Sequence, residues 1–166
     1  MNRLDPSGDD AADWRDLRFR RAEAADAAAV RTLTRAAYAR WCPVIGREPK
    51  PMTADYDAAV RNHLIDLALE NDRLVALIEM IPRADHLLVE NVAVSPEAQG
   101  RGLGRLLMQR AERTAAALAL PQVRLYTNKA FDVNLRFYEA LSYGVDREEP
   151  FKGGIVVHLS KAIGPL

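Results

Sequence analysis

The segment 92–108 places a strand, a sharp turn and a helix in immediate succession. Val92-Ala93-Val94 is a short apolar run, and Ser95-Pro96 ends it. An amphipathic helical pattern then begins among three alternating glycines, Gly100, Gly102 and Gly104. The first turn of a helix leaves four amides unpaired, and the helix dipole adds partial positive charge there. Because glycine lets a ligand approach the backbone, this segment predicts a phosphate or pyrophosphate site.

Two better-known phosphate-binding motifs do not fit this turn. A dinucleotide-binding fingerprint needs Gly or Ala where the chain has Arg105 or Leu107, depending on which glycine is counted first. A Walker loop ends in Gly-Lys-Ser or Gly-Lys-Thr, and the turn has neither. Arg101 and Arg105 can add charged hydrogen bonds at the mouth of the turn. A loop without a ligand is the remaining alternative, although three glycines at a helix start cost backbone entropy.

Two segments of the chain resemble one enzyme family. Gln99-Gly100-Arg101-Gly102-Leu103-Gly104 is similar to the Gln/Arg-x-x-Gly-x-Gly/Ala motif of the GNAT acetyltransferases. The segment from Asn134 to Tyr143 resembles the family's Asn-x-x-Phe-Tyr-x-x-x-Gly-Phe/Tyr stretch, with Ser142 where Gly is common. The resemblance covers about residues 17 to 160. It implies an acyltransferase with acetyl-CoA as co-substrate and no metal.

The resemblance also implies which residues hold the coenzyme. Backbone groups of Val92, Ala93 and Val94 would bind the thioester carbonyl and the pantetheine arm, because the strand splays open there. Amides from Gly100 to Arg105 would hold the pyrophosphate, and Asn134 would add a contact. The implied coenzyme-binding set is Val92, Ala93, Val94, Gln99, Gly100, Arg101, Gly102, Leu103, Gly104, Arg105 and Asn134.

Two residues are candidates for proton transfer. The resemblance implies that Tyr138 protonates the leaving thiolate, and the alternative is an aromatic side chain that only packs in the core. Glu90, expected on the same strand face as Val92 and Val94, is a candidate base acting through a water; a structural carboxylate paired with Arg is its alternative. Glu79 is a second candidate base, whereas His63 and His158 have no partners in the sequence pattern.

The acceptor site is expected in the segment Trp41–Met52, between the first two helices. Its prolines and Gly46 predict a loop, and long loops with aromatic and charged side chains are often functional. The predicted acceptor-binding residues are Tyr38, Trp41 and Arg47, which suit a small-molecule or peptide amine. A hydrophobic lid or a homodimer contact is the alternative. A CoA-binding sensor or interaction module without transfer activity is the alternative function.

Composition narrows the classes of partner. The chain has 166 residues, with 23 Lys plus Arg and 23 Asp plus Glu. This balance gives no support to nucleic-acid binding, because such proteins usually show a basic excess. The sequence contains no run of 18 apolar residues, so it predicts no membrane span. The single cysteine, Cys42, is consistent with a cytoplasmic protein.

Hydrophobic periodicity predicts an α/β fold. The pattern indicates a mostly antiparallel sheet with helices on both faces. The resemblance implies the GNAT type of this fold, a mixed sheet of about seven strands. Residues 1–16 are expected to be a disordered lead-in and 17–166 a single acyltransferase domain. The expected strands are 17–21, 64–70, 73–80, 87–94, 123–127, 143–146 and 155–159. The expected helices start near Asp26 as N-cap, at 53 or 54, within the glycines, and at Asn134. The apolar face expected in the first of them is Val30, Leu33, Thr34, Ala37 and Tyr38, and in the helix after the glycines it is 103, 106, 107, 111, 115 and 118. Tight turns are expected at Asn71-Asp72 and Gly153-Gly154.

Overall fold

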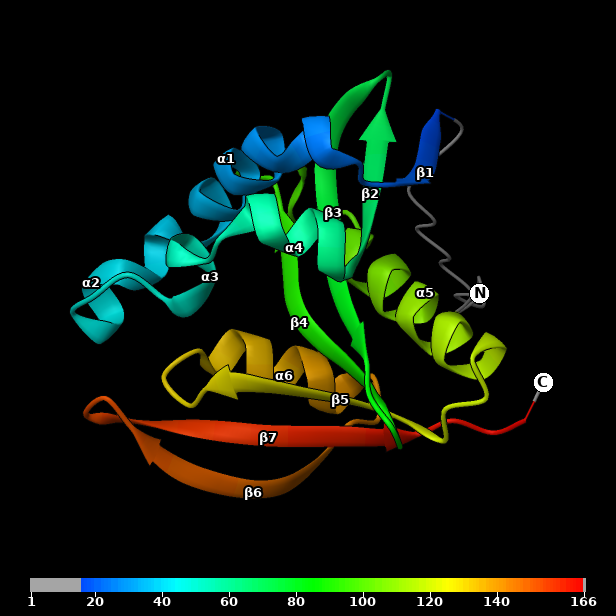
Figure 1. Cartoon of the computed structure of the whole chain (residues 1–166). Coiled ribbons are helices and arrows are strands. Elements are labelled where there is room, and N and C mark those ends of the chain that lie inside the picture. Colours follow the sequence, from blue (N-terminus) through cyan, green and yellow to red (C-terminus); the bar gives the residue numbers. More distant parts are fainter. Residues whose placement is uncertain (1–15, 166) are drawn as a thin grey trace, which may run out of the picture.

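The computed structural model describes residues 16–165, and its seven strands form one sheet (Figure 1). The strands are β1 Leu17–Arg21, β2 Leu64–Glu70, β3 Arg73–Pro82, β4 Leu87–Val94, β5 Gln122–Asn128, β6 Gly144–Phe151 and β7 Gly154–Ala162. Their order is β1-β2-β3-β4-β5-β7-β6, and β4–β5 is the parallel pair among antiparallel neighbours. The predicted sheet is therefore confirmed. The predicted lead-in, apart from Asp16, lies outside the described residues.

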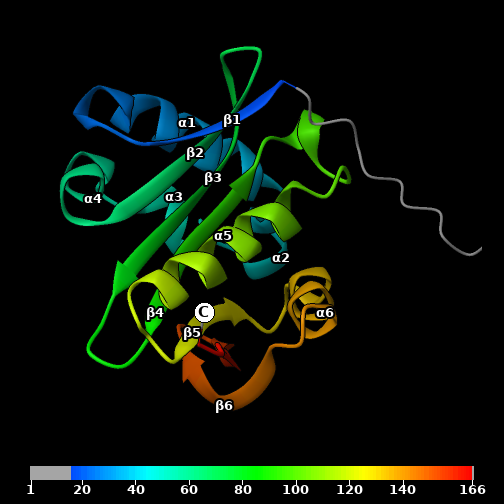
Figure 2. The ribbon, with the colours of Figure 1, turned by 90° about the vertical axis from the view of Figure 1, so that its right-hand side faces the viewer.

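Helices cover both faces of this sheet, as predicted (Figure 2). They are α1 Ala27–Tyr38, α2 Cys42–Ile45, α3 Lys50–Thr53, α4 Tyr56–Asn62, α5 Leu103–Ala117 and α6 Asp132–Ala140. The buried face of α1 consists of Ala27, Val30, Leu33, Thr34 and Ala37, and it packs with α4 on one side of the sheet. The helices α5 and α6 pack on the other side. The apolar spacing in α1 thus predicted its buried face correctly.

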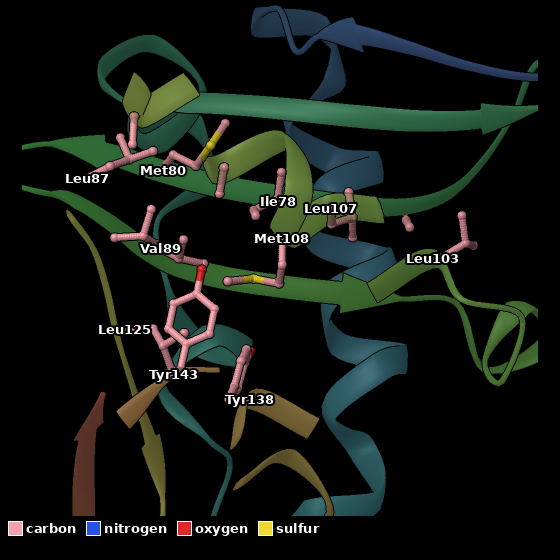
Figure 3. Close-up of a cluster of buried hydrophobic side chains, with 14 of the residues drawn as sticks. Ile78, Met80, Leu87, Val89, Leu103, Leu107, Met108, Leu125, Tyr138 and Tyr143 are labelled. Atoms are coloured by element: carbon pink, nitrogen blue, oxygen red, sulfur yellow. The ribbon is translucent and has the colours of Figure 1, made fainter. Parts of the chain in front are cut away.

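The larger core lies between α5 and the sheet (Figure 3). Leu103, Leu107 and Met108 of α5 are fully buried against β3 and β4. Tyr138 and Tyr143 close the lower edge of the same cluster in this view. Leu118, predicted on the buried face, is 47% exposed because it lies at the C-cap, where the chain turns away. This core fixes the start of α5, and with it the glycine turn.

The prediction that the segment Trp41–Met52 is a loop is wrong in detail. It contains the short helices α2 and α3, each with Pro in its first turn, where the missing N–H costs nothing. Gly46, with φ +71°, ends α2 in the left-handed conformation typical of a helix C-terminus. The next helix begins at Tyr56 rather than at 53 or 54, because the Asp55 carboxylate accepts the amide of Ala58 at 3.0 Å.

Two hairpin turns were predicted from small and polar residues. Asn71-Asp72 joins β2 to β3 with both φ angles positive, at 50° and 63°, as a tight hairpin turn requires. The closing hairpin turns at Lys152-Gly153 instead of at Gly153-Gly154. Gly154 already pairs with Phe151 in the ladder, so the predicted turn was one residue out of register.

A bulge in β4 changes the direction of its side chains. Glu79 pairs with Asn91 and Met80 with Val89, so Glu90 is the extra residue on its strand. Val89 belongs to the core under α5, whereas Asn91 contacts Thr34 and Tyr56 on the α1–α4 side. Glu90 and Asn91 therefore both border the cavity on that side. The prediction that Glu90 shares a face with Val92 and Val94 is wrong, because a bulge interrupts the two-residue alternation.

Asp26 is the N-cap residue of α1, as predicted, although its carboxylate makes no capping hydrogen bond to that helix. Glu23 caps the preceding 3-10 turn Ala24–Asp26, and the Asp26 carboxylate accepts the amide of Glu23 at 2.8 Å in a capping box. Both terminal nitrogens of Arg20 also donate to Asp26 at 2.8 Å. The hydrogen bond from Arg20 is the main reason why the pKa of Asp26 lies below its ordinary value.

Asp26→Asn is expected to lower the free energy of unfolding by about 1 kcal/mol at pH 7, since Arg20 is half exposed and solvent screens the pair. A depressed carboxyl pKa stabilises the folded state above the unfolded pKa of about 4, and this contribution disappears as pH falls through the folded value. The deficit should therefore shrink as the pH falls below about 4, measured by urea unfolding. Asp57→Asn, at an exposed pair with Arg31, is the control with little expected effect. A deficit independent of pH would contradict the assignment.

Candidate active site

The strands β4 and β5 separate in the middle of the sheet. They pair only over Leu87–Val89 of β4, and Figure 1 shows them running apart beyond that point. The segment from Val92 to Val94 continues to pair with β3 on its other side. The splayed strand that the resemblance implied is therefore present. It leaves backbone groups of β4 facing a gap in the ladder, where an extended ligand can hydrogen-bond as a strand would.

The glycine turn lies directly after this open stretch. Gly100 and Gly102 have φ angles of +78° and +84°, and Gly102 is the left-handed N-cap of α5. A Cβ atom built at either glycine would meet no atom within 4 Å. Leu106 donates its amide to the carbonyl of Gly102 at 3.2 Å, and the preceding amides of the helix form its open first turn. The turn thus presents backbone amides to an open volume, as an anion site requires.

Gly104 has a different role from the other two glycines. A Cβ atom there would lie 3.1 Å from the ring carbon Cζ of Phe137. Such a contact is tighter than most Cβ contacts, so a side chain at 104 would push on the Phe137 ring, and Gly104 lets α5 and α6 approach each other. This approach brings α6, with Asn134 and Tyr138 one turn apart, towards the coenzyme motif.

Side chains of the motif are engaged with the protein itself. The guanidinium group of Arg101 donates to both carboxylate oxygens of Glu70 at 3.1 and 2.9 Å. Gln99 donates to the carbonyl of Val94 at 3.2 Å and accepts from Arg40 at 3.4 Å. These contacts tie the turn to β2, β4 and the residues after α1. The predicted phosphate contacts of Arg101 and Arg105 stay predictions.

Tyr138 reaches the split strands from α6. Its side chain is 9% exposed, and its ring packs against Phe137 and Tyr143 with centroids 5.1 and 6.1 Å away. Burial raises its pKa, so Tyr138 keeps its proton at neutral pH. Tyr38 comes from α1 and donates its hydroxyl to the carbonyl of Val92 at 3.2 Å. Burial and the neighbouring tyrosine Tyr138 also raise the pKa of Tyr38. The two tyrosines are therefore close enough to influence each other electrostatically.

A cavity of about 560 Å³ extends from Tyr38 across the same face of the sheet. Residues from α3, α4 and five adjacent strands border it, and the size suits a small acceptor or the tip of a peptide. Of the predicted acceptor residues, Tyr38 and Arg47 line it. Trp41 does not: it is buried and stacks on Phe131, which lines the cavity, at a centroid distance of 4.4 Å. Trp41 therefore supports the cavity wall from behind.

Glu90 lies on the cavity floor with two partners of its own. Its Oε1 accepts the hydroxyl of Tyr126 at 2.8 Å and lies 3.0 Å from the Nζ of Lys50. Lys50 also donates to the Tyr126 hydroxyl at 2.8 Å. Burial lowers the pKa of Lys50, but these two hydrogen bonds outweigh it and leave the pKa above its ordinary value. An ammonium ion thus already lies on the carboxylate that the sequence suggested as a base.

Several polar residues of the cavity were missed in the sequence. The Nδ1 atom of His63 lies 2.6 Å from Oε1 of Glu79, and Nε2 of His158 lies 2.6 Å from Oε1 of Glu149. The sequence pattern showed no partners for either histidine, because both carboxylates come from other strands. Asn91 is 3% exposed, and its Oδ1 atom is a buried acceptor without a hydrogen-bond partner among the described residues. The only signal in the sequence that could have indicated these residues was the occurrence of single polar residues within strands that are otherwise rich in Val, Leu and Ile.

Two further findings concern metals and membranes. Within residues 16–165, no three His, Cys, Asp or Glu side chains are grouped so that they could hold a metal ion. No helix in that part of the chain combines the length and the apolar character that crossing a bilayer requires.

Comparison with known proteins places this geometry in a family. The model of the acetyltransferase (GNAT) family matches residues 28–143. The ribosomal-protein-S18-alanine N-acetyltransferase of Escherichia coli is 16% identical, with a TM-score of 0.74 over 90% of this chain and 96% of that one. The paia N-acetyltransferase of Thermoplasma acidophilum, in complex with coenzyme A, is 15% identical, with a TM-score of 0.68 over 86% and 97% of the two chains.

A third similar structure is yncA of Salmonella typhimurium with its cofactor acetyl-CoA. It is 17% identical, with a TM-score of 0.69 over 90% of this chain and 95% of that one. No curated protein matches the sequence. The structural likenesses show a shared fold, and the family model covers more than half of the sequence. The chain therefore belongs to the acetyltransferase (GNAT) family.

Proposed function

We propose that this protein transfers the acetyl group of acetyl-CoA to an amine bound in the cavity beside β4, within one domain spanning residues 17–166. The observation that carries the proposal is the splay of β4 from β5 next to the glycine turn. Backbone groups of Val92, Ala93 and Val94 would take the thioester and the pantetheine arm, and amides from Gly100 to Arg105 the pyrophosphate. Two similar proteins, paia and yncA, were solved with coenzyme A and acetyl-CoA.

The acceptor amine would attack the thioester directly while both substrates are bound. Tyr38 links the two halves of the site, because it borders the cavity and its hydroxyl contacts the carbonyl of Val92. Tyr138 would give its proton to the leaving thiolate, and burial keeps that proton in place at neutral pH. Glu90, the base suggested by the sequence, would serve only if Lys50 moved away from its carboxylate. Coenzyme contacts of Gln99 and Asn134 complete this proposal.

A panel of amines tests the proposal. The purified protein is incubated with acetyl-CoA and, one at a time, with alkylamines, polyamines, amino acids and short peptides, while release of the CoA thiol is measured. We expect acetyl-CoA to raise the melting temperature, and at least one amine to be acetylated. No stabilisation by acetyl-CoA would overturn the proposal. Stabilisation without transfer to any amine would favour a CoA-binding sensor. The observation that favours this alternative is the Lys50 ammonium, which occupies the carboxylate of the candidate base Glu90.

A further inference from the structure

A histidine paired with a buried carboxylate borders the acceptor cavity. His63 is the residue at which α4 ends and β2 is about to begin, and its side chain is 29% exposed. Its Nδ1 atom lies 2.6 Å from Oε1 of Glu79, which is 3% exposed on β3. Glu79 is paired across the sheet with Asn91, next to Glu90. The pair therefore sits on the cavity floor, one strand away from the residues at the opening.

The hydrogen bond fixes which nitrogen of His63 can take up a proton. An ionised carboxylate only accepts hydrogen bonds, so Nδ1 carries the hydrogen in the neutral imidazole. Nε2 then has a free lone pair, and no hydrogen bond to it occurs among the described residues. This is the arrangement in which a base is oriented by a third group.

The carboxylate of Glu79 is held in place by this contact. Burial raises its pKa above the ordinary value, and the hydrogen bond from His63 counteracts part of that rise. A carboxylate with this environment gains from a neighbouring imidazolium, which would form when Nε2 takes up a proton. The other acidic and basic side chains that border this cavity are Arg47, Lys50, Asp55, Arg83, Glu90, Glu149 and His158.

Glu90 is less suited to accept a proton from the acceptor. Its Oε1 already accepts from Tyr126 and lies beside the Lys50 ammonium. A proton on Glu90 would have to displace at least one of these donors. The free nitrogen of His63 requires no such rearrangement.

We propose that His63, oriented by Glu79, takes the proton from the ammonium form of the acceptor, directly or through one water. This inference rests on the proposed acetyl transfer. The proton moves to Nε2 and later to solvent, which leaves a neutral amine. Its nitrogen then forms a bond to the thioester carbon while the carbon–sulfur bond breaks. Tyr138 gives its proton to the thiolate that leaves. The same nitrogen, now bonded to the acetyl carbon, loses a second proton, which returns to the Tyr138 oxygen, so atoms and charge balance.

The first test is His63→Gln, assayed with the best acceptor found in the amine panel. We expect kcat to fall about 100-fold at pH 7, with an unchanged Kd for acetyl-CoA by calorimetry. The limb of the pH–rate profile that reflects loss of a proton from the free enzyme should disappear. Glu79→Gln keeps an acceptor for Nδ1–H but removes the charge, so a smaller loss is expected. His86→Gln is the matched control, because His86 makes the same 2.6 Å contact with Asp85 away from the cavity.

A second measurement does not depend on an acceptor. Nitrogen-15 NMR of the labelled full chain should show neutral His63 with its hydrogen on Nδ1 and with Nε2 unprotonated. The opposite tautomer would overturn the proposal. So would full kcat and an unchanged pH profile in His63→Gln; His63→Asn repeats the test should the first variant not fold. If the wild type acetylates no amine, the proposed transfer fails, and the tautomer still decides whether His63 is poised as inferred.

Discussion

Gly102→Glu is expected to weaken binding of acetyl-CoA by at least about 100-fold, a loss of roughly 3 kcal/mol of binding free energy. The reason is local. A Cβ at residue 102 would enter open space rather than the protein, and this space lies at the first turn of α5, where the pyrophosphate is proposed to bind. The added carboxylate would both fill that space and repel the phosphates. Calorimetric titration with acetyl-CoA measures the effect.

The variant is expected to fold, because no protein atom lies within 4 Å of the new Cβ. The cost is backbone strain of about 1 kcal/mol, since φ at residue 102 is +84°. Gly153→Glu is a matched control with the same charge, a φ of +77° and equally open surroundings in the β6–β7 turn. It should bind acetyl-CoA as the wild type does. Equal affinity of Gly102→Glu and the control would show that the glycine turn is not the phosphate site.

The parts of the site that were predictable are those made by neighbouring residues. The glycine turn follows from local rules, because positive φ angles and the open first turn of a helix depend on Gly100, Gly102 and the strand before them. The buried face of α1 also follows from spacing alone. Tyr138 was a candidate because the segment from Asn134 to Tyr143 resembles a family motif, and that motif is also a run of neighbouring residues.

The parts that were not predictable depend on contacts between distant segments. The bulge at Glu90 arises from the register between β3 and β4, and no residue type in β4 marks it. It turned Glu90 away from the face of Val92 and gave it Lys50 as a partner. The pairs of His63 and His158 with carboxylates from other strands have the same cause. Trp41 was predicted to bind the acceptor, but it is buried and stacks on Phe131 behind the cavity wall.

The acceptor cavity shows what this difference means for function. Its floor is made where strands far apart in the sequence lie side by side, so its chemistry is set by register and topology. Most of the proposed coenzyme site lies in one continuous segment, 92–105, which is why a motif can identify it. Sequence patterns in this fold therefore say more about the donor than about the acceptor.

Tyr138→Phe is expected to lower kcat about 100-fold while leaving the Kd for acetyl-CoA unchanged. The ring of Tyr138 packs against Phe137 and Tyr143, and phenylalanine keeps these contacts. The hydroxyl makes no hydrogen bond among the described residues, so removing it should leave the free energy of unfolding nearly unchanged. A fall in kcat would therefore show that the reaction needs the proton of this hydroxyl.

Tyr143→Phe is the matched control for this prediction, because Tyr143 lies in the same core cluster and its ring packs against the ring of Tyr138. Its hydroxyl donates to Glu112 at 3.1 Å, so its loss should lower the free energy of unfolding by about 1 kcal/mol and leave turnover intact. Steady-state kinetics with the best acceptor, together with urea unfolding, separate the two effects. If Tyr138→Phe turns over at the wild-type rate, the thiolate takes its proton from another source, and the buried hydroxyl of Tyr138 has no part in the chemistry.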